Sequence, residues 1–185
     1  MGRRLNIGCG QDIRPSSEGW INADIRGVPG TDVVADARHL PCEDGTFEEV
    51  LAYDLLEHVS LFDVPVMLRE WRRVLRPDGI LRLRVPDVRK IALRLLDRSL
   101  EPNPARVQKP NPGVGSPTGE DAAIWLLFGD QSPEWGGTEF GSHHWGYTAI
   151  TLARLLVEEG FKTVAVEGDP QGKDQNLYAA ARKPV

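Results

Sequence analysis

A glycine pair that directly follows an apolar segment is the first feature of this sequence that could do chemistry. Gly8, Cys9 and Gly10 come at the end of Arg4–Gly8, a short run typical of a buried strand. Glycines at a strand end let the backbone approach a bound nucleotide closely. Two glycines alone are a weak signal, so the residues around them must decide which ligand this loop could bind.

The crossover after Gly10 argues against a dinucleotide. A dinucleotide fingerprint has a third glycine three residues after the second, and Ile13 stands there instead. Only nine residues separate Gly10 from Trp20, and they include Pro15 and Gly19. At most one helical turn fits into this connection, so a diphosphate would lack the helix N-terminus that usually binds it. The pattern favours a ligand without phosphate groups and disfavours NAD.

Two carboxylates belong to the next two strand candidates, Ile21–Ile25 and Asp32–Ala35. Asp24 lies at the end of the first strand, and Asp36 directly follows the second. A carboxylate in the position of Asp24 can accept hydrogen bonds from both hydroxyls of a ribose, each contributing roughly 1.5–3 kcal/mol. Asp36 can accept a hydrogen bond from the exocyclic amine of adenine. The spacing therefore predicts a nucleoside-type ligand.

Three of the four histidines lie where they could meet this ligand or its reaction partner. His58 follows the strand candidate Glu49–Tyr53, and His143 and His144 stand beside aromatic residues further along the chain. The ordinary pKa of imidazole suits a general base at neutral pH. We expect His143, His144 and His58, in that order, as catalytic candidates, with hydrogen-bonded structural roles as the alternative. The cysteine and histidine spacing matches no zinc pattern, so we expect no metal site.

The elements that must position these residues alternate along the chain. Short apolar strands alternate with helical patterns, which is typical of a parallel sheet built from crossover units. Helical periodicity predicts helices over Val64–Leu75, after Pro86, and after Thr148, with Asp63, Asp87 and Thr148 as their caps. The remaining strand candidates are Ile80–Val85, Lys162–Glu167 and Leu177–Arg182.

The composition changes between residues 99 and 147. Five prolines exclude a regular element over Glu101–Pro117, while Thr118–Phe128 reads as a short helix. Three of the five tryptophans also fall in this stretch. Long loops in small domains are usually functional or disordered, and the aromatic residues favour function. We expect a single domain over residues 1–185, with 99–147 inserted as a substrate lid.

Taken in order, these segments resemble the class I S-adenosylmethionine-dependent methyltransferases, in particular small proteins with a type 11 methyltransferase domain. The resemblance implies an α/β fold with a Rossmann-like open twisted sheet of seven strands. The strands would be mostly parallel with an antiparallel last strand, and the first crossover helix would be shortened or absent here. The matching segments are LNIGCG, ADI, DARHLPCEDGTFEEVLAYDLLEHV, REWRRVLRPDGILRLRVPD and GYTAITLARLLVEEGF.

The resemblance also implies how S-adenosyl-L-methionine is bound as the cofactor. The backbone of Gly8–Gly10 would cradle its methionine half, while Asp24 would hold the ribose and Asp36 the adenine amine. Asn6 stands where the family often has an acidic residue, so the amino group would be held differently. The full implied set of cofactor-binding residues is Asn6, Gly8, Cys9, Gly10, Asp24, Asp36 and Ala37, with Leu40 against the adenine ring and Tyr53 and Asp54 at the sulfonium end.

The implied function is methyl transfer to a small-molecule or sugar-like acceptor by in-line displacement. Alignment of donor and acceptor can supply roughly 7–11 kcal/mol of such a reaction's barrier. Two alternatives stay open: an NAD-dependent oxidoreductase on a similar fold, and a non-catalytic scaffold protein that binds S-adenosylmethionine. The net charge of -5 argues against nucleic-acid partners, and no apolar run is long enough for a membrane span. With only two cysteines, we expect a cytoplasmic protein.

The strand candidate Ile80–Val85 alternates in polarity, which is unusual for the middle of a parallel sheet. Its apolar residues point one way, and Arg82 and Arg84 point the other. Burying two unpaired guanidinium groups beneath a helix would be very costly. We therefore expect this face to be only partly covered by the chain's own helices. The arginines would pair with acidic groups of the insertion or lie against a second subunit, with a homodimer favoured.

Overall fold

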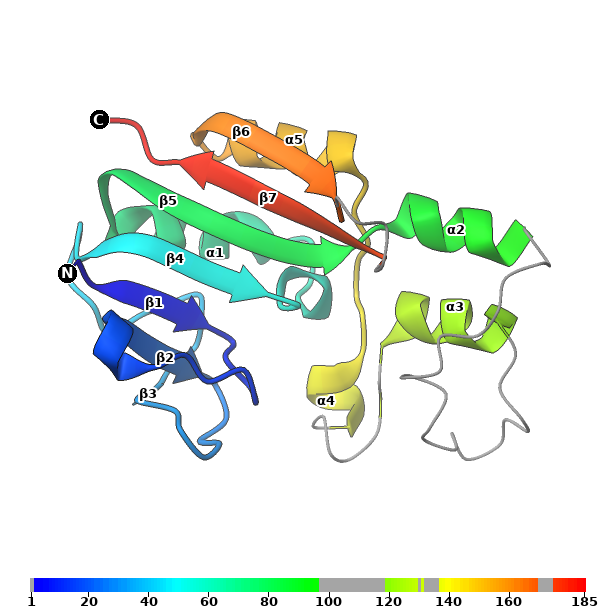
Figure 1. Ribbon diagram of the computed structural model, residues 1–185, viewed down its shortest axis with the longest axis horizontal. Coiled ribbons are helices and arrows are strands. Elements are labelled where there is room, and N and C mark those ends of the chain that lie inside the picture. The colour runs from blue at the N-terminus through cyan, green and yellow to red at the C-terminus, as the bar shows by residue number, and fades with distance from the viewer. Residues whose placement is uncertain (1, 97–118, 130, 132–136, 170–174) are drawn as a thin grey trace.

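Seven strands form one sheet, in the spatial order β3-β2-β1-β4-β5-β7-β6 (Figure 1). The computed structural model describes residues 2–96, 119–129, 131, 137–169 and 175–185. All strands run parallel except β7, which is antiparallel to β5 and β6. The expected α/β fold, a seven-stranded, Rossmann-like sheet with a reversed last strand, is confirmed. The strands are β1 Arg4–Ile7, β2 Trp20–Asp24, β3 Val33–Val34, β4 Phe47–Tyr53, β5 Leu75–Pro86, β6 Lys162–Gly168 and β7 Asn176–Arg182.

The strand candidates agree closely with these bounds, apart from the start of β5. The strand candidate began at Ile80, but the residues from Leu75 to Gly79, which include Pro77, already belong to β5. Leu75 already pairs with Phe47 of β4, and the register then shifts before Ile80 pairs with Glu49. Asp78 takes a positive φ of 60° in this irregular stretch. Pro77, Asp78 and Gly79 therefore lie in an irregular part of the β4–β5 pairing.

In the described part of the chain, five helices and two 3₁₀ turns connect the strands. Thr148 caps α5, because its hydroxyl accepts from the backbone N–H of Thr151, and Asp87 accepts from the backbone N–H of Arg89 at the start of α2. The predicted cap of α1 is wrong: Asp63 already has a helical backbone, and its carboxylate accepts from Arg38 instead. Across the described ranges, no helix is long and apolar enough to cross a membrane. The elements are α1 Val64–Val74, α2 Val88–Leu96, α3 Gly119–Phe128, α4 Gly137–Gly141 and α5 Ala149–Glu158, with 3₁₀ turns at Ser16–Glu18 and Leu56–His58.

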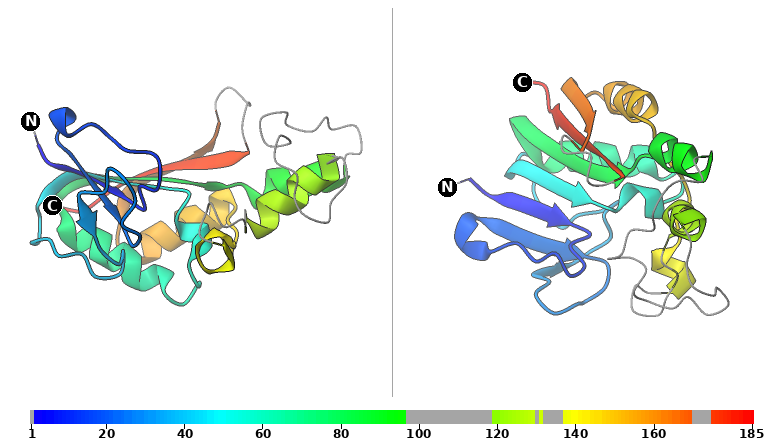
Figure 2. Two further views of the ribbon diagram at one scale, coloured as in Figure 1. Left: turned by 90° about the horizontal axis from the view of Figure 1, so that it is seen from below. Right: turned by 45° about the vertical axis from the view of Figure 1, so that its right-hand side comes forward.

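The main core lies between one face of the sheet and helices α1 and α5, which both cover that face (Figure 2). The apolar stripe expected along α1 is buried there and includes Met67 and Trp71. The indole nitrogen of Trp71 also donates to the backbone oxygen of Ala37 at 3.0 Å. This bond fastens the loop after β3, which carries Asp36, to the helix below the sheet.

The opposite face of the sheet is covered by no helix in the described parts of the chain (Figure 2). The connection between β1 and β2 contains only the 3₁₀ turn Ser16–Glu18, which confirms that the first crossover helix is shortened. Nine residues between Gly10 and Trp20 leave no room for more. The connection must therefore be held to the sheet by other means than the apolar face of a helix.

Two buried asparagines, each 2% exposed, hold this connection. The side-chain nitrogen of Asn6 donates to the backbone oxygen of Asp12 at 2.7 Å and to the side-chain oxygen of Asn22 at 3.1 Å. Asn22 in turn accepts from the backbone N–H of Arg14 and donates to its carbonyl oxygen, both at 2.9 Å. Asn6 and Asn22 are register partners on β1 and β2. Two amide side chains thus hold the connection to the sheet, where a full crossover helix would pack through its apolar face.

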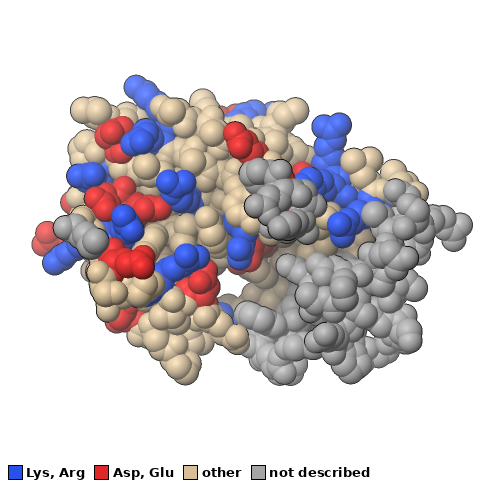
Figure 3. Space-filling model, viewed as in Figure 1, with Lys and Arg blue, Asp and Glu red and all other residues tan. Residues whose placement is uncertain are grey.

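The open face carries paired charges. Arg82 donates to Glu49 at 2.8 Å and Arg84 donates to Asp54 at 3.0 Å, both across the β4–β5 pair. Figure 3 shows basic and acidic side chains interspersed over this face. The expected partial covering is confirmed for the described residues. The expected pairing with acidic groups of the insertion is wrong, while the alternative of a second subunit stays a prediction. Acidic groups on the neighbouring strand and just beyond it satisfy both arginines, because a long side chain can reach residues that lie diagonally to it on the adjacent strand.

We expect Asn6→Asp to destabilise the fold, although an acidic residue is common at this position in the family that the sequence resembles. The carboxylate would have no N–H to donate to Asp12 and would lie buried against two oxygen acceptors. We expect a loss of more than about 2 kcal/mol in chemical denaturation, because a buried charge is left unpaired. Asn6→Ala should cost less, roughly 1–3 kcal/mol. Equal stability of the Asp variant and the unmodified chain would show that the asparagine pair does not hold the connection.

The open face leads to a second expectation. The Arg82 side chain is 46% exposed, so its ion pair is screened by water. In a monomer, Arg82→Ala should therefore lower the free energy of unfolding by less than about 1 kcal/mol. The homodimer stays a prediction, and light scattering tests it directly. A loss of several kcal/mol that depends on concentration would contradict our expectation and indicate that a second copy covers the face.

Candidate active site

A cavity of about 1120 Å³ opens at the carboxyl ends of the parallel strands. This is where open α/β sheets bind ligands, and the volume is ample for a nucleoside-sized ligand and a second small molecule. Gly8, Asp24, Tyr53 and Pro86 bring the ends of β1, β2, β4 and β5 to its wall. The insertion supplies the facing wall through Leu126, Gly129, Glu139, Phe140, Gly141 and His143. The stretch Glu101–Pro117 lies outside the described residues.

The glycine turn is built onto Asp24. Gly8 and Gly10 take positive φ angles of 64° and 47°, which favour glycine, and both line the cavity. The backbone N–H of Gly10 donates to one carboxylate oxygen of Asp24 at 2.8 Å, and that of Arg26 donates to the other at 2.8 Å. The Nε atom of Arg26 also donates to Asp24, at 3.2 Å, so about one of the four acceptor positions of the carboxylate remains for a ligand hydroxyl. Cys9 also lines the cavity, and its thiol lies 3.8 Å from the hydroxyl of Thr31.

Asp36 lines the cavity together with Ala37, at the place expected for adenine. Two side-chain nitrogens of Arg38, Nε and Nη2, donate to the two carboxylate oxygens of Asp36 at 3.0 and 2.7 Å. These hydrogen bonds hold the pKa of Asp36 below its ordinary value. The carboxylate is therefore ionised at neutral pH and fixed in orientation, as an acceptor for an amine should be.

Leu40, expected against the adenine ring, does not line the cavity. It is 5% exposed and belongs to the main core. Its backbone N–H donates to Glu70 on α1 at 2.7 Å, which turns this part of the loop toward the helix. Asn6 does line the cavity, but its side-chain nitrogen is committed to the β1–β2 connection.

Tyr53 and Asp54 line the cavity at the end of β4. Asp54 has a positive φ of 52°, and its carboxylate accepts from the guanidinium of Arg84. That guanidinium also stacks at 4.8 Å from the centre of the Tyr53 ring. Arg84 thus fixes both side chains, a role that sequence reasoning missed because it considered only the face on which this arginine lies.

The three histidines expected near the reaction separate into two groups. His58 and His143 line the cavity, and their rings lie 4.7 Å apart, whereas His144 is exposed and does not line it. The backbone N–H groups of His144 and Trp145 donate to the carbonyl oxygen of Glu57, at 2.7 and 3.3 Å. This anchoring brings the end of the insertion onto the 3₁₀ turn Leu56–His58.

Backbone carbonyls orient both cavity histidines. The Nδ1 atom of His58 lies 3.1 Å from the oxygen of Ser142, and that of His143 lies 2.9 Å from the oxygen of Leu126. A carbonyl oxygen can only accept, so each Nδ1 carries a hydrogen. In the neutral ring the Nε2 atom then carries the lone pair. Burial lowers the pKa of His58, which favours this neutral form.

Glu57 was not among the expected site residues, although it directly precedes His58. It is 1% exposed, lines the cavity, and its Oε2 atom has no hydrogen-bond partner among the described residues. Burial, reinforced by the negative charge of Asp54, raises the pKa of Glu57 well above its ordinary value. The hydroxyl of Tyr147 is likewise buried without a partner in this part of the structure. Unsatisfied polar atoms therefore gather beside the two histidines.

Comparison with known proteins finds a matching family model and solved structures with the same fold. Residues 5–83 match a family model described as a methyltransferase domain. The match runs from β1 into β5 and includes the glycine turn, Asp24, Asp36 and the turn that carries Glu57 and His58. No curated protein matches the sequence significantly.

Solved structures with the same fold cover nearly the whole chain. One is a SAM-dependent methyltransferase from Methanosarcina mazei, with 20% identity, a TM-score of 0.58, and coverage of 99% of this chain and 92% of that chain. Another, from Archaeoglobus fulgidus, has 14% identity, a TM-score of 0.61, and coverage of 98% and 86%. A third, the Burkholderia thailandensis 1,6-didemethyltoxoflavin-N1-methyltransferase, has 15% identity, a TM-score of 0.59, and coverage of 100% and 72%. The family match over residues 5–83 and the shared fold show that the chain is similar to S-adenosylmethionine-dependent methyltransferases, a likeness that supports S-adenosyl-L-methionine as its cofactor.

Proposed function

We propose that the chain methylates a small-molecule or sugar-like acceptor whose nucleophilic atom is held at His58 and His143. The observation that carries this proposal is the single cavity that joins the glycine turn at one end to the histidine pair at the other. The family match favours methyl transfer over an oxidoreductase or a non-catalytic scaffold. The Burkholderia structure holds 1,6-didemethyltoxoflavin together with S-adenosylhomocysteine, so this fold accommodates a small acceptor beside the cofactor.

The cofactor would lie along the ends of β1, β2 and β4. In this proposal the backbone at Gly8–Gly10 faces the methionine half, Asp24 accepts from the ribose hydroxyls, and Asp36 accepts from the adenine amine. The ionised, arginine-held state of Asp36 and the buried position of Asp24 support these roles. Tyr53 and Asp54 then border the methyl group.

The acceptor would enter between the strand ends and the insertion. Leu126, Phe140 and His143 supply apolar and polar walls there, which supports the role of the described part of the insertion as a substrate lid. Methyl transfer needs the acceptor atom in line with the sulfur–carbon bond, so positioning is the main catalytic contribution. A neutral imidazole with its Nδ1–H held by a carbonyl can also accept the acceptor's proton at Nε2, a contribution of about 10²–10⁴-fold. A cytoplasmic location stays an expectation.

Asp24→Asn tests the cofactor site. The substitution keeps the shape but replaces one acceptor oxygen with a donor. We expect the affinity for S-adenosylhomocysteine to fall by about 1.5–3 kcal/mol, roughly 10–150-fold, in isothermal titration calorimetry. Asp78→Asn, an exposed change on β5 away from the cavity, is the matched control and should leave the affinity unchanged. Unchanged affinity of the Asp24 variant would remove this carboxylate from the cofactor site.

His58→Ala and His143→Ala test the acceptor end. We expect each to lower kcat by about 10²-fold or more, because both positioning and proton acceptance are weakened. The measurement is release of S-adenosylhomocysteine with a panel of phenols, amines and sugars. The affinity for S-adenosylhomocysteine itself should change little. His39→Ala, an exposed histidine outside the cavity, serves as the control. A parallel loss of cofactor affinity would instead place the histidines at the cofactor.

A further inference from the structure

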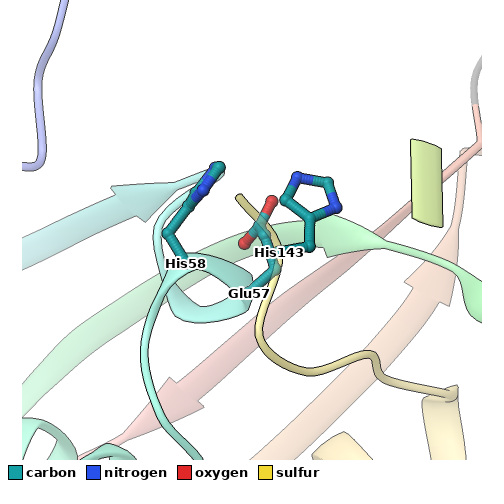
Figure 4. A group of neighbouring side chains, drawn as sticks. All are labelled: Glu57, His58 and His143. Atoms are coloured by element: carbon teal, nitrogen blue, oxygen red, sulfur yellow. The ribbon is translucent and has the colours of Figure 1, made fainter. Parts of the chain in front are cut away.

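We propose that Glu57, His58 and His143 form a binding site for one divalent transition-metal ion, of the Zn²⁺ class, at the acceptor end of the cavity. One potential ligand atom from each residue lies within 4.8 Å of the other two. Figure 4 shows the carboxylate of Glu57 between the two imidazole rings. The cation site itself stands on this geometry, while its use in catalysis rests on the proposed function.

One oxygen of the buried carboxyl group of Glu57 lacks a hydrogen-bond partner among the described residues. Its side chain is 99% buried, since only 1% of the residue is exposed, and Oε2 accepts no hydrogen bond from the described residues. A buried carboxylate without a partner costs several kcal/mol. The nearby guanidinium of Arg84 is already paired with Asp54. A bound cation would supply the missing counter-charge to Glu57.

The two histidines are prepared as metal ligands. A ligating imidazole almost always donates its second N–H to a carbonyl, carboxylate or water, which fixes the ring and leaves the other nitrogen for the ion. In both rings a carbonyl holds the Nδ1 hydrogen, that of Ser142 for His58 and that of Leu126 for His143. The two supporting carbonyls come from different parts of the insertion, so the rings are oriented independently of each other.

The backbone already holds the three residues near the required spacing. Glu57 and His58 share the 3₁₀ turn Leu56–His58, and the backbone N–H groups of His144 and Trp145 tie His143's neighbours to Glu57. Metal–ligand distances of about 2.0–2.2 Å require ligand atoms about 3–3.6 Å apart. Side-chain rotations that draw the atoms slightly together are therefore sufficient.

The donor set selects the kind of ion. Two imidazole nitrogens and one carboxylate oxygen suit Zn²⁺, Co²⁺ or Fe²⁺, whereas Mg²⁺ and Ca²⁺ prefer oxygen ligands. Three protein ligands leave coordination positions open toward the cavity. The expectation that no metal site exists came from sequence spacing, which cannot detect ligands that the fold brings together from a turn and a distant insertion.

The ion would hold an acceptor oxygen beside the methyl group. With the ion bound, the imidazole nitrogens would act as ligands and would no longer accept a proton. Coordination would instead favour loss of the O–H proton to water. The oxygen then forms a bond to the methyl carbon while the carbon–sulfur bond breaks and its electron pair stays on sulfur, giving S-adenosylhomocysteine. No electrons are gained or lost overall, so the ion needs no redox change.

The test is direct metal binding by a full-length chain without a histidine tag, stripped with chelator and dialysed. We expect calorimetry to show one Zn²⁺ per chain, and Co²⁺ to give visible absorption bands of a nitrogen- and oxygen-ligated ion. Glu57→Gln and His143→Ala should each weaken Zn²⁺ binding by more than about 10-fold. His144→Ala, the exposed neighbour, should leave Zn²⁺ affinity unchanged, and excess Mg²⁺ should not compete.

S-adenosylhomocysteine titration of every variant separates the outcomes. Cofactor binding without specific Zn²⁺ binding would overturn the metal site and leave the proposed function standing. Specific Zn²⁺ binding without cofactor binding would support the metal site and overturn the proposed function. Zn²⁺ binding that survives Glu57→Gln and His143→Ala in cofactor-binding variants would also overturn the proposal, because the ion would then bind elsewhere.

Discussion

The short connection between β1 and β2 is the constraint on which the rest of the structure depends. Nine residues cannot hold a full crossover helix, so one face of the sheet stays open. An open face must carry side chains that water tolerates, and the alternation in β5 supplies them as arginines. The same connection cannot dock through an apolar helix face, so the amides of Asn6 and Asn22 fasten it. The glycine turn is held in position by these amide hydrogen bonds and by the bond from the backbone N–H of Gly10 to Asp24.

Much of the fold could be predicted because its signals are local. Strand bounds follow from apolar runs, and the caps at Asp87 and Thr148 follow from residue type. The errors came where tertiary contacts override local preference. Leu40 lies in the core because its backbone N–H donates to Glu70. The carboxylate of Asp63 accepts from Arg38 and does not cap the first turn of α1. Arg82 and Arg84 pair with Glu49 and Asp54 because the pairing of β4 with β5 brings these side chains together. The sequence alone does not reveal that pairing.

The two ends of the cavity differ in how they could be predicted. The proposed cofactor end is built from strand ends, whose order the sequence pattern reveals, so Asp24 and Asp36 could be placed at the cavity from spacing alone. The acceptor end joins a turn after β4 to an insertion far along the chain. Which of His143 and His144 enters the cavity depends on backbone bonds to Glu57 and on the carbonyl of Leu126. Adjacent residues in an extended stretch point to opposite sides, so one of the pair had to face away.

The anchoring of the insertion by main-chain hydrogen bonds has a consequence for how acceptor preference can evolve. The N–H groups of His144 and Trp145 bind Glu57 whatever side chains those residues carry, because every residue except proline offers the same donor. Side chains along the insertion wall, such as Leu126 and Phe140, can therefore change without releasing the segment that carries His143. If the proposed function holds, substitutions in this wall would change the preferred acceptor, while the histidine pair and the glycine turn would keep their alignment.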